Sequence, residues 1–494
     1  MRLFFILAFL FPTLLAAQDE HNHPAPEKLG MASFPTSCKP GTQPEFDRAV
    51  ALLHSFAYAA AEEAFRSVAA QDSQCSMAHW GIAMTHFHQL WEPPLPLAGI
   101  PLGQKEINQA ETLEEASKRE RGFVHALSLI FKDASTVPYS TRVSSYETAM
   151  RELAGANMGD VEAQVFYALA LISNASPTDK QHVKQKQAAD LLEPLYREFP
   201  NHPGIPHYLI HAYDNQELAP RGLAAARAYA DIAPSAPHAL HMPSHIFTRL
   251  GEWDDSIASN LAARSAAHRQ RDTGEELHAM DYLVYAYLQS GRDQEAAQVI
   301  QQLTAMQNLD LGEFKIGYAA TAMPIRCIIE RHQWIDAAKI VDPPGSVQPH
   351  VLAIAVWARG LGLARSGRAQ EAAHESKTLR GIEEQIRASG SGYWATQTSI
   401  QRREIMAWSA QAEHRPDEAV TLMRSAADDE DGIEKLPVTP GPIVPAREQL
   451  GDLLLEQGDA ASASKAFETA LVNAPGRRGA LQGAARIAAR VANK

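Results

Sequence analysis

Two pairs of histidines recur at a fixed spacing near the middle of the chain. His207 and His211 are four residues apart, as are His241 and His245, and each member of the second pair follows its counterpart by 34 residues. Residues four apart lie on the same face of a helix, so each pair presents two imidazoles in one direction. Two imidazoles one helical turn apart occur in helical zinc sites. The spacing therefore predicts a histidine-rich patch at which a transition metal could bind.

Two further histidines and two carboxylates belong to the same region. His238 and His278 occupy equivalent places, each 13 residues before a glycine. Neighbouring helices pack about 8–10 Å apart, and a histidine nitrogen ligates zinc at about 2.0–2.1 Å, so imidazoles from adjacent helices can reach one ion. Asp214 and Asp281 are near enough in sequence to add a ligand or to orient a ring. The predicted ligands of one Zn, Cu, Fe or Ni ion are His207, His211, His238, His241, His245, His278, Asp214 and Asp281.

The same stretch also fits a groove that binds a protein, a peptide or a small molecule. Aromatic rings and neutral histidine offer flat surfaces and hydrogen-bond donors to such a ligand. Arg249, one turn beyond His245, can hold a carboxylate or a phosphate. The predicted ligand-binding residues are Tyr208, Tyr213, Phe247, Arg249 and Tyr285. A third interpretation is that the histidines only bond the backbone where the segments PGIP and MPS distort the helix starts.

The sequence leaves open whether the chain is an enzyme. It contains no nucleophile elbow, phosphate-binding glycine loop, HExxH or dinucleotide fingerprint. Metal-assisted hydrolysis or oxidation at the histidines is the enzymatic hypothesis that remains, with Asp214 or Asp281 as the base and Tyr213 as the acid. No catalytic residue is assigned beyond these roles. A binding protein and a metalloprotein are therefore the two hypotheses.

The segments that carry the histidines belong to a repetitive helical pattern. Ala61 and Phe65 in the N-terminal part, and Gly451 and Phe467 in LGDLLLEQGDAASASKAFETALVNAP, take the small and large positions of a tetratricopeptide (TPR) unit, whose period is 34 residues. We therefore predict an all-α fold over residues 45–494, a TPR-like α-solenoid of helix-turn-helix repeats that forms a right-handed superhelix with a concave groove. The resemblance implies that the first helix of each pair lines this groove, which would place the histidines on its inner wall.

Four longer strings narrow the resemblance. DSQCSMAHWGIAM, HPGIPHYLIHAYD, HALHMPSHIFTRLGEW and PVTPGPIVPAREQLGDLLLEQG together resemble a family of exported bacterial TPR proteins. The resemblance covers nearly all of the chain after its first segment. It implies the fold and export, and it implies no particular activity.

The first 44 residues differ from the array. Residues 1–17, MRLFFILAFLFPTLLAA, have the cation, the apolar run and the small residues of a signal peptide, which predicts a periplasmic or secreted protein. Residues 18–44 are polar and proline-rich, and we expect an extended or disordered leader. Two proline-rich loops are predicted inside the array, at 91–103 and 428–445. No later stretch has the roughly 20 apolar residues of a membrane span.

Charge and cysteine content limit the partners. The formal net charge of −13 argues against a nucleic-acid partner, whose phosphates need a basic face. Three cysteines, Cys38, Cys75 and Cys327, suffice for one bridge in an oxidising compartment. A Cys38–Cys75 pair would pin the leader to the first repeat, and three free thiols are the alternative. Oligomeric state is not predicted.

Overall fold

The computed structural model describes residues 27–90 and 98–492. The predicted signal peptide, the first part of the leader and residues 91–97 of the first loop lie outside the described residues. The described residues form helices and contain no strand. No helix among them is long and apolar enough to cross a bilayer.

The helices follow one another with short connections. The first half contains a 3-10 turn (Pro40–Thr42) and α1 (Gln43–His54), α2 (Tyr58–Gln71), α3 (Ser76–Met84), α4 (Gly99–Thr112), α5 (Lys118–Phe131), α6 (Tyr139–Ala156), α7 (Val161–Ser173), α8 (Val183–Glu198), α9 (Gly204–Tyr213), α10 (Ala219–Ile232), α11 (Pro237–His241) and α12 (Pro243–Leu250). The second half contains α13 (Trp253–Gln270), α14 (Thr273–Gln289), α15 (Asp293–Ala305), α16 (Phe314–Glu330), α17 (Trp334–Ala337), α18 (Pro349–Arg365), α19 (Ala369–Ala388), α20 (Gly392–Ala412), α21 (Pro416–Asp431), α22 (Ala446–Glu456), α23 (Ala460–Asn473) and α24 (Arg478–Ala492).

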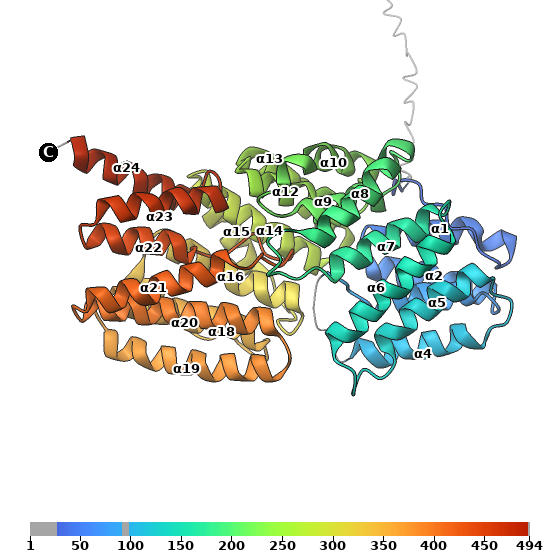
Figure 1. Ribbon diagram of the computed structural model, residues 1–494, viewed down its shortest axis with the longest axis horizontal. Coiled ribbons are helices and arrows are strands. Elements are labelled where there is room, and N and C mark those ends of the chain that lie inside the picture. Colours follow the sequence, from blue (N-terminus) through green and yellow to red (C-terminus); the bar gives the residue numbers. More distant parts are fainter. Residues whose placement is uncertain (1–26, 91–97, 493–494) are drawn as a thin grey trace, which may run out of the picture.

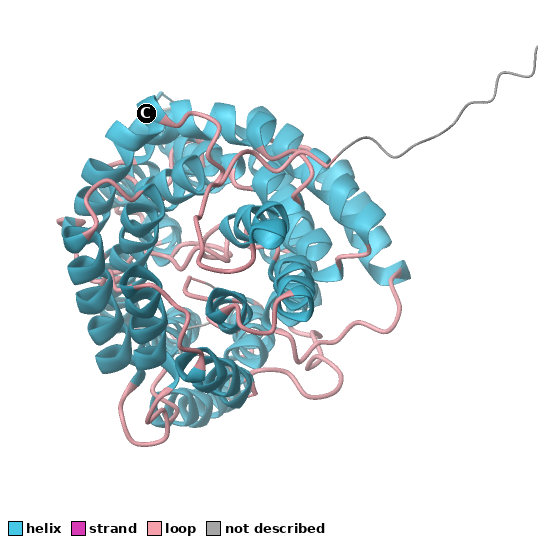
Figure 2. Cartoon of the chain, turned by 90° about the vertical axis from the view of Figure 1, so that its right-hand side faces the viewer, coloured by secondary structure: helices cyan, strands magenta, loops and turns pink. Residues whose placement is uncertain are grey.

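Successive helices pack against one another as antiparallel pairs, and each pair packs on the next (Figure 1). The stack winds round, so that from one end the helices surround a central region crossed by loops (Figure 2). This arrangement is a TPR-like α-solenoid, as the sequence predicted.

Small and large residues meet at the helix contacts. A Cβ atom on Gly81 of α3 would lie 2.4 Å from the ring of Phe65 on α2. A Cβ atom on Gly451 of α22 would lie 2.6 Å from the ring of Phe467 on α23. Only glycine leaves room for the phenylalanine that fills each wedge, and close packing of this kind determines how the repeats stack.

The part of the leader that the structure describes is anchored to the array. The amide of Met31 donates to the carbonyl of Asn201 at 2.9 Å. Phe34 is fully buried and its ring packs against Phe46 and other aromatic rings. Residues 28–39 form no helix, and the first turn begins at Pro40. The burial of Phe34 therefore makes this segment part of the N-terminal core.

Cys38 and Cys75 form a disulfide. It joins the end of the leader to the start of α3, as expected for a leader pinned to the first repeat, and it leaves Cys327 as a free thiol.

Both proline-rich loops are shorter than predicted. Residues 99–103 belong to α4, because Pro101 lies in the first turn of a helix, where the missing N–H is tolerated. Residues 428–431 belong to α21, so the second loop spans residues 432–445. We call this segment the inner loop, because Tyr282 of α14 donates to its carbonyl at Thr439, at 3.1 Å, and Arg326 of α16 donates to its carbonyl at Pro442, also at 3.1 Å.

Candidate metal centre

Proline residues shape the helices that carry the histidines. Pro203 precedes α9, and Pro243 separates α11 from α12 because it cannot donate a backbone hydrogen bond. Met242 between them keeps right-handed helical dihedral angles, so the two short helices continue almost in line. A Cβ atom on Gly204 would lie 2.6 Å from Nδ1 of His54, so glycine allows α9 to approach α1 closely.

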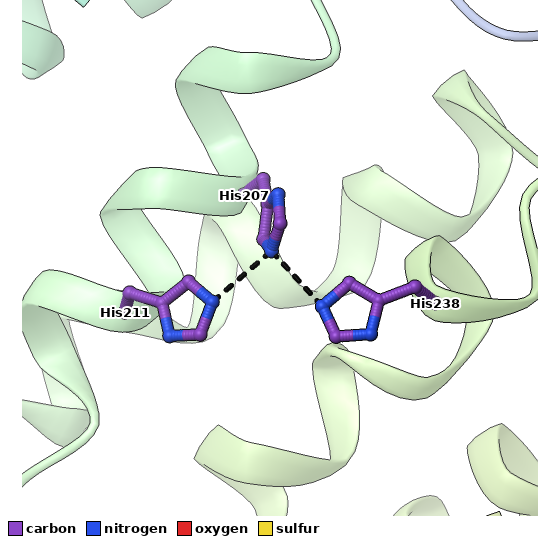
Figure 3. Close-up of side chains that lie close together, drawn as sticks. All are labelled: His207, His211 and His238. Atoms are coloured by element: carbon purple, nitrogen blue, oxygen red, sulfur yellow. Dashed lines mark hydrogen bonds between the residues drawn. The ribbon is translucent and has the colours of Figure 1, made fainter. Parts of the chain in front are cut away.

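Three imidazoles converge between α9 and α11. Nε2 of His207 lies 3.1 Å from Nε2 of His211 and 3.2 Å from Nε2 of His238 (Figure 3). We call these residues the first triad. His207 and His211 come from one helical turn, as their spacing predicted, and His238 comes from the next repeat.

A second group lies one repeat further along. Nε2 of His241 lies 3.0 Å from Nε2 of His245, and the ring of His278 on α14 lies 4.1 Å from that of His241 between centroids. We call these residues the second triad. In each triad the three potential ligand atoms lie within 4.8 Å of one another.

The two triads are buried and adjacent. Their six histidines are at most 7% exposed. The ring centroids of His211 and His245 are 6.0 Å apart, and those of His238 and His241 are also 6.0 Å apart. The prediction of a histidine-lined groove therefore needs correction, because these side chains face one another inside the protein and not an open surface.

Hydrogen bonds fix the tautomers of His241 and His245 in the second triad. Nδ1 of His241 lies 2.6 Å from Oδ1 of Asn260, whose Nδ2 donates to the carbonyl of Ser256, so the amide oxygen faces the imidazole. Nδ1 of His245 lies 2.9 Å from Oδ2 of Asp214. Both partners accept hydrogen bonds, so both Nδ1 atoms carry the hydrogen. In neutral rings the two Nε2 atoms then face each other with lone pairs at 3.0 Å.

The first triad also brings lone pairs of imidazole nitrogens together. Nδ1 of His207 donates to the carbonyl of His54 at 2.6 Å, which leaves one lone pair on its Nε2. Two nitrogens, from His211 and His238, approach that lone pair, and it can accept one hydrogen. Nδ1 of His238 lies 3.3 Å from a carboxylate oxygen of Glu275, and Nδ1 of His211 is buried with no hydrogen-bond partner among the described residues.

Protonation at neutral pH does not place a hydrogen between these facing lone pairs. Burial lowers the pKa of His245 to about 4, although the Asp214 carboxylate opposes this shift. Burial, reinforced by neighbouring histidines, lowers the pKa values well below the usual range for His207, His211, His241 and His278. These five imidazoles are therefore neutral, which is the form that ligates metals. A cation between the Nε2 atoms would satisfy lone pairs that otherwise repel each other.

Asp214 contacts the second triad at Nδ1 of His245, on the side of the ring away from the facing Nε2 atoms. Besides its contact with His245, its carboxylate accepts hydrogen bonds from Arg249 at 2.8 Å and from Lys435 of the inner loop at 2.9 Å. Burial alone would raise the pKa of Asp214, but Lys435 and Arg249 outweigh it and hold this pKa well below its usual range. Asp214 thus orients a potential ligand through Nδ1, as outer carboxylates do in metal sites.

A third buried cluster differs from the triads because its hydrogen bonds are complete. His54 lies 2.8 Å from one oxygen of Glu162 through Nε2 and 2.9 Å from the Tyr208 hydroxyl through Nδ1. His202 accepts from the amide of Gly204 through Nδ1 and faces the other Glu162 oxygen through Nε2. Neutral histidines satisfy every one of these contacts, so this cluster needs no metal.

Two of the predicted residues lie away from the triads. Asp281 faces Arg326, with 3.8 Å between its Oδ1 and the guanidinium Nε, and burial raises the pKa of Asp281 to about 6. The Tyr213 hydroxyl donates to Glu193. The geometry thus gives neither residue a direct role at the histidines.

The other predicted ligand-binding residues divide into two groups. Tyr208 and Phe247 are buried in the solenoid and face no open groove. Arg249 and Tyr285 line a cavity beside the inner loop. Sequence reasoning missed Asn260, Glu275 and Lys435, and no spacing pattern connects them to the histidines.

Fold and site together define a helical-repeat protein with a buried polyhistidine centre. Among solved structures, the chain is similar to a chain of the APC/C hetero-tetramer Cut9–Hcn1, with 9% identity over 90% of this chain and 76% of that chain, and a TM-score of 0.38. It is also similar to the TPR domain of P58(IPK), with 11% identity over 92% and 99% and a TM-score of 0.23. Human IFIT1, solved as a dimer with m7Gppp-AAAA, gives 10% identity over 85% and 90% and a TM-score of 0.37.

These similarities concern the helical-repeat fold alone. No protein-family model matches the chain, and no curated protein matches it in sequence.

Proposed function

We propose that this protein binds transition-metal ions, one in each histidine triad. The contact between Nε2 of His241 and Nε2 of His245 carries the proposal. Both rings donate their Nδ1 hydrogens, His241 to Asn260 and His245 to Asp214. At neutral pH the lone pairs of the two Nε2 atoms therefore face each other, and a cation is the partner that fits between them. The first triad repeats the arrangement with an engaged Nδ1 on His207.

The donor set limits the metal. Each triad offers three imidazole nitrogens and neither thiolate nor carboxylate, a set that suits Zn, Cu, Fe or Ni and disfavours Mg and Ca. Three protein ligands leave a coordination position open, as in catalytic zinc sites. Hydrolysis or oxidation at a bound metal is accordingly the activity to screen once the metal is known.

Burial affects how the metal would be acquired. Because the six histidines are at most 7% exposed, an ion would reach them while the repeats pack or when they open locally. Metal binding would then add to the folding free energy of the central repeats. Chelation should therefore act slowly on the folded protein.

Elemental analysis of the untagged protein tests the proposal. The wild-type protein is expected to hold about two ions per chain and the variant His241→Asn, His245→Asn about one, because asparagine can keep a donor near Nδ1 and has no ligand at the Nε2 position. His202→Gln, which removes a buried histidine of the third cluster, should leave the metal content unchanged. Wild-type protein without metal, or equal content in wild type and double variant, would contradict the proposal.

We also propose that the protein functions outside the cytosol. The Cys38–Cys75 disulfide supports this location, because such bonds persist in oxidising compartments. The experiment is to fractionate cells that express the full chain and to assay where the oxidised protein accumulates. Recovery of the reduced protein in the cytosol alone would contradict it.

Binding of a protein, a peptide or a small molecule is a second candidate function. It is supported by the cavity that Arg249 and Tyr285 line, whose wall includes none of the six triad histidines.

A further inference from the structure

A cavity lies between the inner loop and two C-terminal helices. Its volume is about 170 Å³, below the roughly 300 Å³ of pockets for drug-sized ligands. His350, Ile354 and Trp357 line it from α18, and Trp394 and Glu404 line it from α20. The residues of each helix are spaced by three, four, seven or ten positions, so they lie on one face of that helix. The size indicates a small ligand.

Among the described residues, the buried Glu404 and the partly buried Glu430 line this cavity without an ion-pair partner within 4.0 Å. Glu404 is 2% exposed, and its oxygens accept hydrogen bonds from Nε1 of Trp357 at 2.6 Å and from Nε2 of Gln449 at 2.8 Å. Glu430 accepts from the amide of Ala446 at 2.7 Å. Among the described residues, no lysine, arginine or histidine nitrogen lies within 4.0 Å of either carboxyl group as an ion pair.

The surroundings of these two carboxyl groups affect their pKa values. Burial, with some repulsion from Glu430, raises the pKa of Glu404 well above its usual range. Burial raises the pKa of Glu430 to about 8. Both shifts favour the protonated carboxyl groups, and a positively charged ligand beside them would favour their ionised forms instead.

The cationic side chains of the cavity wall form ion pairs with other carboxylates. Arg249 and Lys435 contact Asp214, Lys180 contacts Glu434, and Arg447 contacts Asp428 and Asp431. Among the described residues, Glu404 and Glu430 are the carboxyl groups of the cavity wall that form no ion pair within 4.0 Å.

Aromatic rings form another part of the wall. The imidazole of His350 stacks on the ring of Trp394, with centroids 4.3 Å apart and planes 12° apart. His350 is 9% exposed, and its Nε2 is buried without a hydrogen-bond partner in the described part of the chain. Burial lowers the pKa of His350 to about 3, so the ring is neutral at pH 7 and carries one hydrogen, on Nδ1 or on Nε2. The ring of Tyr393 lies 5.0 Å from that of Trp394.

We propose that this cavity binds a small organic ammonium ion, with its charged nitrogen towards Glu404 and Glu430 and its apolar body against Trp394 and Tyr393. Carboxylates and aromatic faces both attract an organic cation, and the attraction is stronger where water is excluded. Seven residues of helix separate His350 from Trp357, which is about 10 Å along α18. The ligand therefore has several carbon atoms between its apolar end and its charge. The inference uses no residue of the triads and is independent of bound metal.

Calorimetric titration of the full chain with three matched probes tests the proposal. The probes are 4-phenylbutylammonium, 4-phenylbutanol and 4-phenylbutyrate, which share one body and differ in charge. The ammonium ion is expected to bind at least tenfold more tightly than the alcohol and the carboxylate. Glu404→Gln with Glu430→Gln should reduce ammonium binding at least tenfold, since both amides are of similar size and cannot ionise beside the ligand.

A control separates charge in the cavity from charge elsewhere. Glu371→Gln removes an exposed carboxylate that pairs with Arg368, and it should leave the affinity unchanged. Trp394→Ala tests the aromatic wall and should weaken the binding of the ammonium ion and of the alcohol to a similar degree. Equal binding of all three probes, tighter binding of the carboxylate, or no binding of the ammonium ion would overturn the proposal.

Discussion

Proton uptake by His350 should weaken the C-terminal repeats in acid. Burial lowers the pKa of this imidazole from 6.5 to about 3. A histidine with a lowered folded-state pKa contributes stability above its unfolded pKa of 6.5, and this contribution is lost as the pH falls towards 3. At pH 5 the folded ring is still neutral while the unfolded ring is protonated. The difference of 1.5 pH units corresponds to about 2 kcal/mol, or roughly a 30-fold change in an opening equilibrium.

The variant His350→Phe removes this proton uptake and keeps a ring that can stack on Trp394. Hydrogen exchange measured by mass spectrometry on peptides of α18 and α20 reports local opening. Between pH 8 and pH 5, after correction for intrinsic exchange rates, wild type should lose about 30-fold more protection than the variant. The exposed His268, replaced by glutamine, is the control and should behave as wild type. Equal pH dependence in His350→Phe and wild type would refute the reasoning.

Three further predictions concern the triads and the N-terminal segment. Asp214→Asn should lower metal affinity by about 10–100-fold, because an amide replaces the carboxylate behind His245, and competition with a chromophoric chelator measures it. Unchanged affinity would contradict the role of Asp214. Removing metal with a chelator should cost about 2.7 kcal/mol of stability for each site, or about 5.4 kcal/mol for the two triads, relative to protein held at 100 times the dissociation constant. His202→Gln should show the same loss, and His241→Asn, His245→Asn, which keeps one site, should show about half of it. Cys38→Ala with Cys75→Ala should destabilise the N-terminal helices by about 4 kcal/mol, given the separation of 37 residues, as seen in their hydrogen exchange; undiminished protection would contradict this value.

The fold was predictable because each repeat of such a protein has its own sequence pattern and packs against its neighbours in the chain. Pairs of small and large residues within one repeat, such as Gly451 and Phe467, can be recognised from the sequence of that repeat alone. The pairing of His207 with His211 and of His241 with His245 followed from helical periodicity in the same way. These contacts span four residues, and sequence spacing determines such contacts directly.

Contacts between distant segments were not predictable. Lys435 reaches Asp214 across 221 residues, and nothing in the sequence of the inner loop connects the two. Asp281 was predicted at the metal site, but packing of α14 on α16 directs it to Arg326. The histidines were expected on an exposed inner wall, and their burial depends on how the curved stack closes around them. Periodicity gives the face of a helix, and tertiary packing decides what covers that face.

Anomalous X-ray diffraction at the absorption edge of the metal identified in the purified protein tests the central claim most directly. The account predicts two peaks, one within about 2.0–2.2 Å of Nε2 in the first triad and one at the same distance in the second. It also predicts no peak at the cluster of His54, Glu162 and His202. Absence of peaks at both triads in crystals of metal-containing protein, or a peak confined to exposed residues such as His268, would contradict it.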